Sequence, residues 1–280
     1  MKKSLYLFLL ILSGNISVAQ TIVCSPIDRT TLEEKIVEMQ GLVQPSYGDT
    51  LVTIGKSFLG TPYVAKTLEV GETESLVINL QGLDCTTYVE NVLAFGTMLR
   101  KGEKDLNTFA KTLESIRYKD GKLKGYPSRL HYFSEWIANN NSKGLIKDIT
   151  ADLGGNAMTK DINFMSTHRE LYPFLSDEDN YLQIKASERY LNGRPIYVLA
   201  KDKIEAKEHM IQSGDIIALA TSIDGLDVTH TGFAIRKESG RIHLLHASSS
   251  NEEVEISELP LADYLNGIRH NTGIMVARPL

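Results

Sequence analysis

The spacing of apolar residues changes about two thirds of the way along the chain, and this change limits the possible fold class. In the first half of the chain, and again over residues 176–191, apolar side chains mostly recur three or four positions apart, as on one face of an α-helix. From Asp215 onwards they gather in short runs, separated by turn signals at Asp224-Gly225 and Ser239-Gly240. Helices followed by a strand meander are typical of α+β proteins. We therefore predict N-terminal helices packed on a C-terminal antiparallel sheet of about five or six strands.

The same spacing predicts the individual elements. The expected helices cover residues 31–39, 51–58, 85–102, 106–116, 130–137 and 176–191. The expected strands cover residues 215–219, 230–235 and 241–246, with 254–256 and 273–276 as further candidates. Residues 140–175 are irregular in pattern and stay unassigned. Because no linker is visible, we predict one domain over residues 20–280, with a long helical insertion around residues 103–195.

The first 19 residues have the pattern of a secretory signal peptide. Lys2 and Lys3 precede an apolar run from Leu5 to Leu12, and Ser17-Val18-Ala19 resembles a cleavage site. The apolar run is too short to span a bilayer, and the sequence has no other candidate for a transmembrane helix. We therefore expect a periplasmic or secreted protein. The formal net charge of −5 gives no support for binding nucleic acid or anionic lipid.

The chain has two cysteines, Cys24 and Cys85. In an oxidising compartment they could form a disulfide. However, Cys24 lies in the N-terminal tail of the mature chain, where order is usually poor. Lipidation of Cys24 would call for small residues just before it, which Gln20 to Val23 do not provide. We therefore treat Cys24 as incidental.

Cys85 is placed where a cysteine can act as a nucleophile. It lies at the start of the predicted helix 85–102, where free backbone N–H groups and the helix dipole favour an anion and lower a thiol pKa. A nucleophilic thiol also needs a base and a group that orients the base. His230 begins one predicted strand and His246 lies on the next, so their imidazoles could meet. These three residues point to a cysteine hydrolase, although each alone is weak evidence.

Other classes of catalytic site receive little support from the sequence. His243 and His246 are three residues apart, so on a strand they face opposite sides and cannot easily share a metal ion. The chain has no G-x-S-x-G for a serine hydrolase and no Gly-rich phosphate-binding motif. We expect neither a metal nor another cofactor.

Five short blocks resemble the NlpC-type cell-wall cysteine hydrolases, a papain-like superfamily. They occur in the family's order across residues 59–248: Leu59-Gly60-Thr61-Pro62-Tyr63, Asp84-Cys85-Thr86, Gly214-Asp215-Ile216, His230-Thr231-Gly232-Phe233 and His246-Ala247-Ser248. The resemblance implies a papain-like fold, with Cys85 as nucleophile, His230 as general base and acid, and His246 as the orienting residue. It also implies that Tyr63, Asp84 and Thr86 border the substrate or the oxyanion.

Two further segments resemble one branch of this superfamily, formerly known only as a domain of unknown function. They are Leu83–Asn91 and Ser128–Phe133. Members of the branch are N-acetylmuramoyl-L-alanine amidases that act on peptidoglycan or its fragments. By this resemblance Arg129 and His131 line the substrate groove. The alternative is that these two side chains cap a helix and shield the core.

The resemblance thus implies an exported amidase that attacks the N-acetylmuramoyl-L-alanine bond. The same site could serve a γ-D-glutamyl-diamino acid endopeptidase, because the groove selects the bond. A catalytically inactive peptidoglycan-binding module and a thiol-dependent acyltransferase are also compatible with these residues. The sequence does not distinguish intact peptidoglycan from soluble muropeptides as the partner.

Overall fold

The computed structural model describes residues 22–42 and 44–280. The predicted signal peptide, residues 1–19, lies outside these ranges. Within them, none of the helices is both long enough and apolar enough to cross a membrane.

The described residues form helices and strands that are mixed along the chain. The α-helices are α1 (Pro26–Glu38), α2 (Tyr47–Lys56), α3 (Cys85–Arg100), α4 (Leu106–Arg117), α5 (Phe133–Ser142), α6 (Phe164–Thr167), α7 (Glu178–Asn192), α8 (Ile204–Lys207) and α9 (Leu261–Asn266). The strands are β1 (Ile22–Cys24), β2 (Leu76–Ile78), β3 (Ile146–Asp148), β4 (Asn156–Met158), β5 (Ile196–Ala200), β6 (Ile216–Thr221), β7 (Val228–Arg236), β8 (Ile242–Ser248), β9 (Glu253–Ile256) and β10 (Asn271–Pro279).

The main sheet confirms the predicted α+β class and is larger than expected. Its order is β4-β5-β10-β6-β7-β8-β9, with β3 also paired to β10, and its pairings are antiparallel. The sheet therefore has eight strands instead of five or six. Two of the additional strands, β3 and β4, lie within the predicted insertion, so that segment is not purely helical. A separate parallel pair joins β1 to β2.

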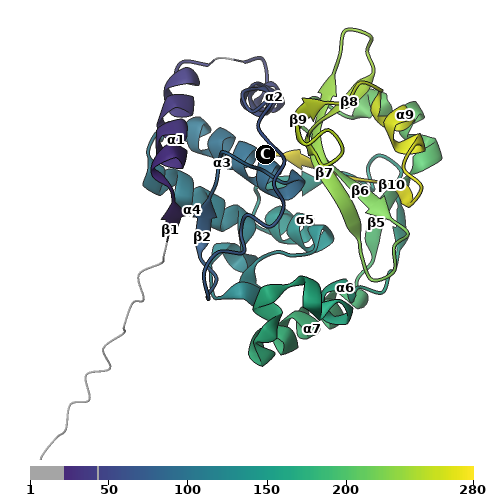
Figure 1. Ribbon diagram of the computed structural model, residues 1–280. Coiled ribbons are helices and arrows are strands. Elements are labelled where there is room, and N and C mark those ends of the chain that lie inside the picture. The colour runs from purple at the N-terminus through teal and green to yellow at the C-terminus, as the bar shows by residue number, and fades with distance from the viewer. Residues whose placement is uncertain (1–21, 43) are drawn as a thin grey trace, which may run out of the picture.

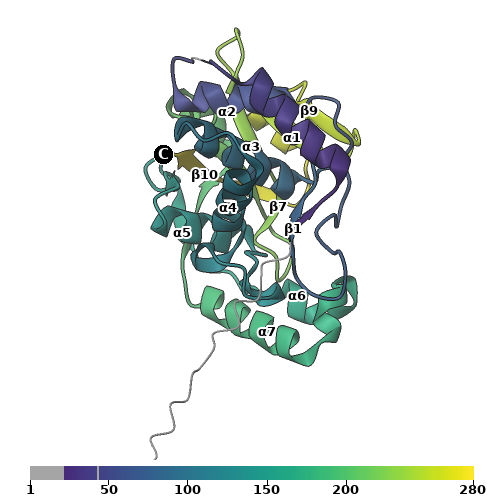
Figure 2. The same ribbon diagram turned by 90° about the vertical axis from the view of Figure 1, so that its left-hand side faces the viewer.

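Side chains alternate between the two faces of the sheet and build a core on each. Along β6, Ile216, Ala218 and Ala220 belong to the larger core with α1 to α5, whereas Ile217 and Leu219 belong to the core with α8 and α9. Figure 1 shows α1 to α5 on one side of the sheet and α9 on the other. Figures 1 and 2 both place α6 and α7 at one end of the molecule, where a third apolar cluster lies.

Helix α3 is the central helix of the larger core. Its residues from Thr87 to Met98 are all buried, and it packs against α2, α4, β7 and β8. A helix that is enclosed on every side has a fixed axis, so its first residue is held in a defined position. That first residue is Cys85.

The N-terminal segment differs from the sequence prediction in two respects. Helix α1 begins at Pro26 and not near Thr31, because Ser25 caps it by accepting a hydrogen bond from the backbone N–H of Asp28 at 3.2 Å. Proline at the first helical position is a usual start signal. Cys24 lies in an ordered strand instead of a loose tail, and both Cys24 and Cys85 are free thiols.

Candidate active site

The first turn of α3 holds Cys85 in place through a capping box. The Asp84 carboxylate accepts a hydrogen bond from the backbone N–H of Thr87 at 2.7 Å. In return, the Thr87 hydroxyl oxygen accepts one from the backbone N–H of Asp84 at 3.0 Å. This reciprocal pair satisfies two backbone donors at the helix start. Asp84 is therefore the N-cap residue of α3, and the half-buried Cys85 follows it directly.

The segment that carries Tyr63 is held between the β8–β9 turn and the residue before Asp84. On one side, the backbone N–H groups of Gly60 and Tyr63 donate to the carbonyls of Val254 and Glu252, at 2.9 and 2.7 Å. On the other side, Tyr63 bridges Leu83, two residues before Cys85. The structure thus brings the first and second sequence blocks together.

His230 and His246 contact each other directly. The distance from His230 Nε2 to His246 Nδ1 is 2.6 Å, and the two rings are nearly perpendicular with centroids 4.8 Å apart. Gly232 makes this approach possible, because a Cβ at that position would lie 2.8 Å from the Cβ of His246. His230 is half-buried and His246 is fully buried.

Thr231 connects this histidine pair to the start of α3. Its hydroxyl donates to the Cys85 carbonyl at 2.9 Å. Thr231 and the side chain of Thr86 also act to lower the pKa of the Cys85 thiol, against the larger effect of burial. No sequence pattern predicted a role for Thr231. Its position inside the His230-Thr231-Gly232 block was the one signal that could have found it.

The pKa of the Cys85 thiol differs from the sequence prediction, and burial also shifts the pKa values of its neighbours. Burial, with a smaller contribution from Asp84, raises the pKa of the Cys85 thiol to about 11, which overrides the predicted lowering by the helix start. Burial lowers the pKa of His230 to about 4 and that of His246 to about 3. Burial and the neighbouring Cys85 raise the pKa of Tyr63 to about 12. At neutral pH the free protein therefore holds a neutral thiol, two neutral imidazoles and a protonated phenol.

Arg129 and His131 have structural partners in the described residues. Arg129 is only 7% exposed, and its guanidinium pairs with Glu69 at 3.1 Å and Glu74 at 2.9 Å. The Nε2 atom of His131 lies 3.0 Å from the carbonyl of Tyr126, and its ring packs on the Tyr126 ring. These contacts favour a structural role, in which both side chains stabilise the loops beside α3.

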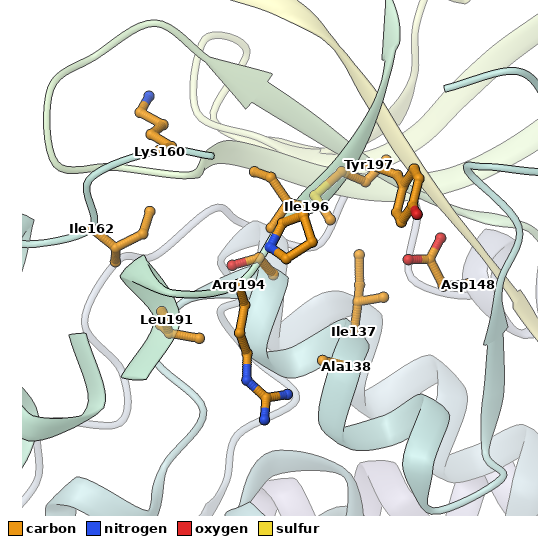
Figure 3. A pocket seen from close by; sticks show the side chains of 12 residues that line it. Ile137, Ala138, Asp148, Lys160, Ile162, Leu191, Arg194, Ile196 and Tyr197 are labelled. Carbon is orange, nitrogen blue, oxygen red and sulfur yellow. The ribbon is translucent and has the colours of Figure 1, made fainter. Parts of the chain in front are cut away.

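A cavity of about 220 Å³ lies between α5, β3, β5 and the end of α7 (Figure 3). None of its lining residues belongs to the predicted site. Lys160 and Arg194 line it, but Figure 3 shows their charged ends pointing in opposite directions. Ligand sites are usually larger and carry converging polar groups, so the histidine pair and Cys85 remain the candidate site.

Comparisons with known proteins find solved structures with the same overall fold. Among solved structures, an N-acetylmuramoyl-L-alanine amidase from Bacteroides uniformis has a TM-score of 0.80 at 38% identity, over 84% of this chain and 99% of that chain. A "putative xylanase" from Bacteroides fragilis has a TM-score of 0.76 at 44% identity, over 80% of this chain and 98% of that chain. A DUF1460 protein from Legionella pneumophila is 21% identical, with a TM-score of 0.67 over 90% of this chain and 94% of that chain, which shows a shared fold alone. No curated protein sequence matches the chain.

A family model gives the assignment. The model for AmiA-like proteins, described as N-acetylmuramoyl-L-alanine amidase-like, matches residues 53–274. This range spans most of the chain and contains Tyr63, Cys85, His230 and His246. It confirms the resemblance to the amidase branch. The chain therefore belongs to the AmiA-like, N-acetylmuramoyl-L-alanine amidase-like family.

Proposed function

We propose that this protein is an exported cysteine amidase that hydrolyses the N-acetylmuramoyl-L-alanine bond of peptidoglycan or its fragments. The observation that carries the proposal is the free Cys85 thiol at the start of α3, where the Cys85 carbonyl accepts a hydrogen bond from Thr231, the residue that follows His230 of the His230–His246 pair. Membership of the AmiA-like family supports the choice of bond. Export through residues 1–19 and the assignment of residues 20–280 to one catalytic domain are part of the proposal.

In the proposed acylation step, the Cys85 sulfur attacks the lactyl carbonyl carbon. The thiol proton passes to His230, the carbonyl oxygen gains the negative charge, and the C–N bond to L-alanine then breaks. His230 returns the proton to the departing amine, which leaves a thioester on Cys85. In this proposal the Cys85 backbone N–H and the protonated Tyr63 phenol donate hydrogen bonds to the oxyanion.

In the proposed deacylation step, water replaces the amine. His230 accepts a proton from the water, whose oxygen attacks the thioester carbonyl and releases the free lactyl carboxyl group. The sulfur leaves as thiolate and recovers its proton from His230. No cofactor takes part in either step.

The pKa values predict a broad pH optimum. His230 can accept a proton only when neutral, and its pKa of about 4 keeps it neutral from pH 5 upwards. The Cys85 thiol, with a pKa of about 11, ionises only in strong alkali. We expect kcat/KM to rise near pH 4 and stay level until the pH approaches 11, in a profile that belongs to the coupled pair. Limbs between about pH 6 and pH 9, where unperturbed His and Cys titrate, would contradict this.

The name of the Bacteroides fragilis relative suggests a different reaction, which the site does not favour. Glycosidases usually flank the scissile bond with two carboxyl groups, one acting as an acid. At the site described above, the proposed reacting groups are a thiol and an imidazole. The two nearby carboxylates are engaged elsewhere, since Asp84 caps α3 and Glu255 pairs with His246 and Asn251. The closest alternative is therefore a γ-D-glutamyl-diamino acid endopeptidase, which needs the same thiol chemistry.

The proposed bond can be tested by identifying products. The mature protein is incubated with purified muropeptides, and the products are separated and identified by mass. We expect a free peptide that begins with L-alanine, together with an intact N-acetylmuramic acid fragment. Cleavage after D-glutamate would replace the amidase with the endopeptidase. No turnover on any muropeptide would favour the binding module, and release of sugars from xylan alone would favour the glycosidase.

A further inference from the structure

The second ring nitrogen of His246 faces a carboxylate that the reaction above does not use. His246 Nδ1 is occupied by His230, and His246 Nε2 is buried without a hydrogen-bond partner among the described residues. The Glu255 Oε1 atom lies 3.6 Å from this Nε2. This distance is longer than a direct hydrogen bond but close enough for the charge of the carboxylate to act on the ring.

Glu255 is held in this position by the sheet and by a neighbouring side chain. Strands β8 and β9 pair His246 directly with Glu255, so both side chains project from the same face. The Asn251 side-chain amide donates to Glu255 Oε2 at 2.7 Å, which leaves Oε1 directed at the ring. The Tyr264 ring contacts His246 edge-on, with centroids 5.7 Å apart, and limits rotation of the imidazole.

The carboxylate decides which nitrogen of His246 carries the proton. With the proton on Nε2, an N–H faces the negative charge, which is attractive. With the proton on Nδ1, the Nε2 lone pair faces the carboxylate, which is repulsive. The Nε2–H form is therefore favoured, and Nδ1 becomes an acceptor.

The tautomer of His246 determines the tautomer of His230, the proposed base. If His246 Nδ1 accepts, His230 Nε2 must donate across the 2.6 Å contact. The Nδ1 atom of His230 is then unprotonated and free to accept a proton. The opposite arrangement would leave His230 with a proton on Nδ1, and it could not act as a base through that atom.

We propose that Glu255 is a positioning residue that sets the tautomers of His246 and, through it, of His230. The inference rests on the proposed function, because it matters for catalysis only if His230 is the base. Glu255 itself touches neither Cys85 nor the substrate in the proposed reaction. The tautomers can be measured without substrate, so this inference can fail independently of the proposed function.

The direct test is nitrogen NMR of the whole mature protein labelled with ¹⁵N-histidine. We expect both His230 and His246 to carry their proton on Nε2. In Glu255→Leu, which removes the acceptor, we expect His246 to shift towards the Nδ1–H form. Glu255→Gln keeps a carbonyl acceptor and should keep the wild-type tautomers. An Nδ1–H form of His246 in the wild-type protein, or unchanged tautomers in Glu255→Leu, would overturn the proposal.

A kinetic test uses the same variants on muropeptides. For Glu255→Leu we expect kcat to fall by about 10- to 100-fold with little change in KM, because a wrong tautomer removes the base from the proposed reaction. Glu255→Gln should recover most of the activity. Glu258→Leu, at an exposed acidic residue just beyond β9, serves as the matched control and should behave as wild type. Equal losses in Glu255→Gln and Glu255→Leu, or a similar loss in Glu258→Leu, would show a role for surface charge or packing instead of the acceptor.

Discussion

Replacing Cys85 with alanine should abolish release of the L-alanine-initiated peptide from muropeptides, with kcat lowered by at least about 10³-fold. The substitution removes the only atom that forms the thioester in the proposed reaction, while the His230–His246 pair stays in place. Cys85→Ser should lose nearly as much, because a neutral imidazole that activates a thiol is a weaker activator of a hydroxyl, whose intrinsic pKa is higher. Product formation by mass, at high and matched enzyme concentrations, measures both losses.

The second cysteine provides the matched control. Cys24 lies in β1 as a free thiol, and its Sγ contacts the carbonyl of Ser25 at 3.7 Å. Cys24→Ala should therefore keep wild-type kcat and KM. Thermal unfolding of all three variants checks that they fold. If folded Cys85→Ala kept more than about a tenth of wild-type activity, the thioester mechanism would be wrong.

The elements that could be predicted best are the longer ones, in which apolar residues recur at a regular spacing. Helices α3, α4 and α7 and strands β6, β7 and β8 lie within a few residues of their expected positions. Strands β3 and β4 are three residues long, which is too short for any alternation to be recognised. They join the sheet because β10 and β5 have unpaired edges at these positions. These edges exist only in the folded molecule, so a local sequence pattern cannot predict them.

The sequence suggests which residues form the candidate site, whereas their contacts could not be predicted. The sequence placed His230 and His246 on neighbouring strands, but their 2.6 Å contact depends on strand register and on the missing side chain of Gly232. Glu255 was missed because a register shift of one residue would place Val254 or Ile256 opposite His246. The only sequence signal that included Glu255 was the predicted strand 254–256.

The pKa of Cys85 shows a different limit of sequence reasoning. The helix start is visible in the sequence, and it lowers the thiol pKa. Burial, which results from packing of α3 against the sheet, raises it, and in this structure burial has the larger effect. Burial depends on residues far apart in the chain, so a local motif indicates only one of the two opposing effects.

The largest effect on stability is expected in the core below Cys85, where Arg117 of α4 pairs with Glu90 of α3. The two side chains are 1% and 2% exposed, and Arg117 Nε lies 2.6 Å from Glu90 Oε2. Arg117 also donates to the Val77 carbonyl at 2.7 Å. Arg117→Leu should lower the free energy of unfolding by about 3–5 kcal/mol, because it leaves a buried carboxylate without its counter-charge. Urea unfolding followed by circular dichroism gives the value.

The pH dependence and a double variant separate lost charge pairing from lost packing. Burial already raises the pKa of Glu90 and Arg117 opposes the rise, so without Arg117 the folded-state pKa climbs further. A carboxyl group whose pKa is raised in the folded state makes the folded protein less stable as the pH rises above the pKa of the unfolded chain. The stability lost in Arg117→Leu should therefore grow from pH 4 to pH 8.

Adding Glu90→Leu removes the unpaired charge and should restore most of the stability. Lys147→Leu, which breaks the exposed pair with Asp152, should cost no more than about 1 kcal/mol. A double variant no more stable than Arg117→Leu alone would show that packing of the guanidinium stem, and not the ion pair, holds α3 to α4.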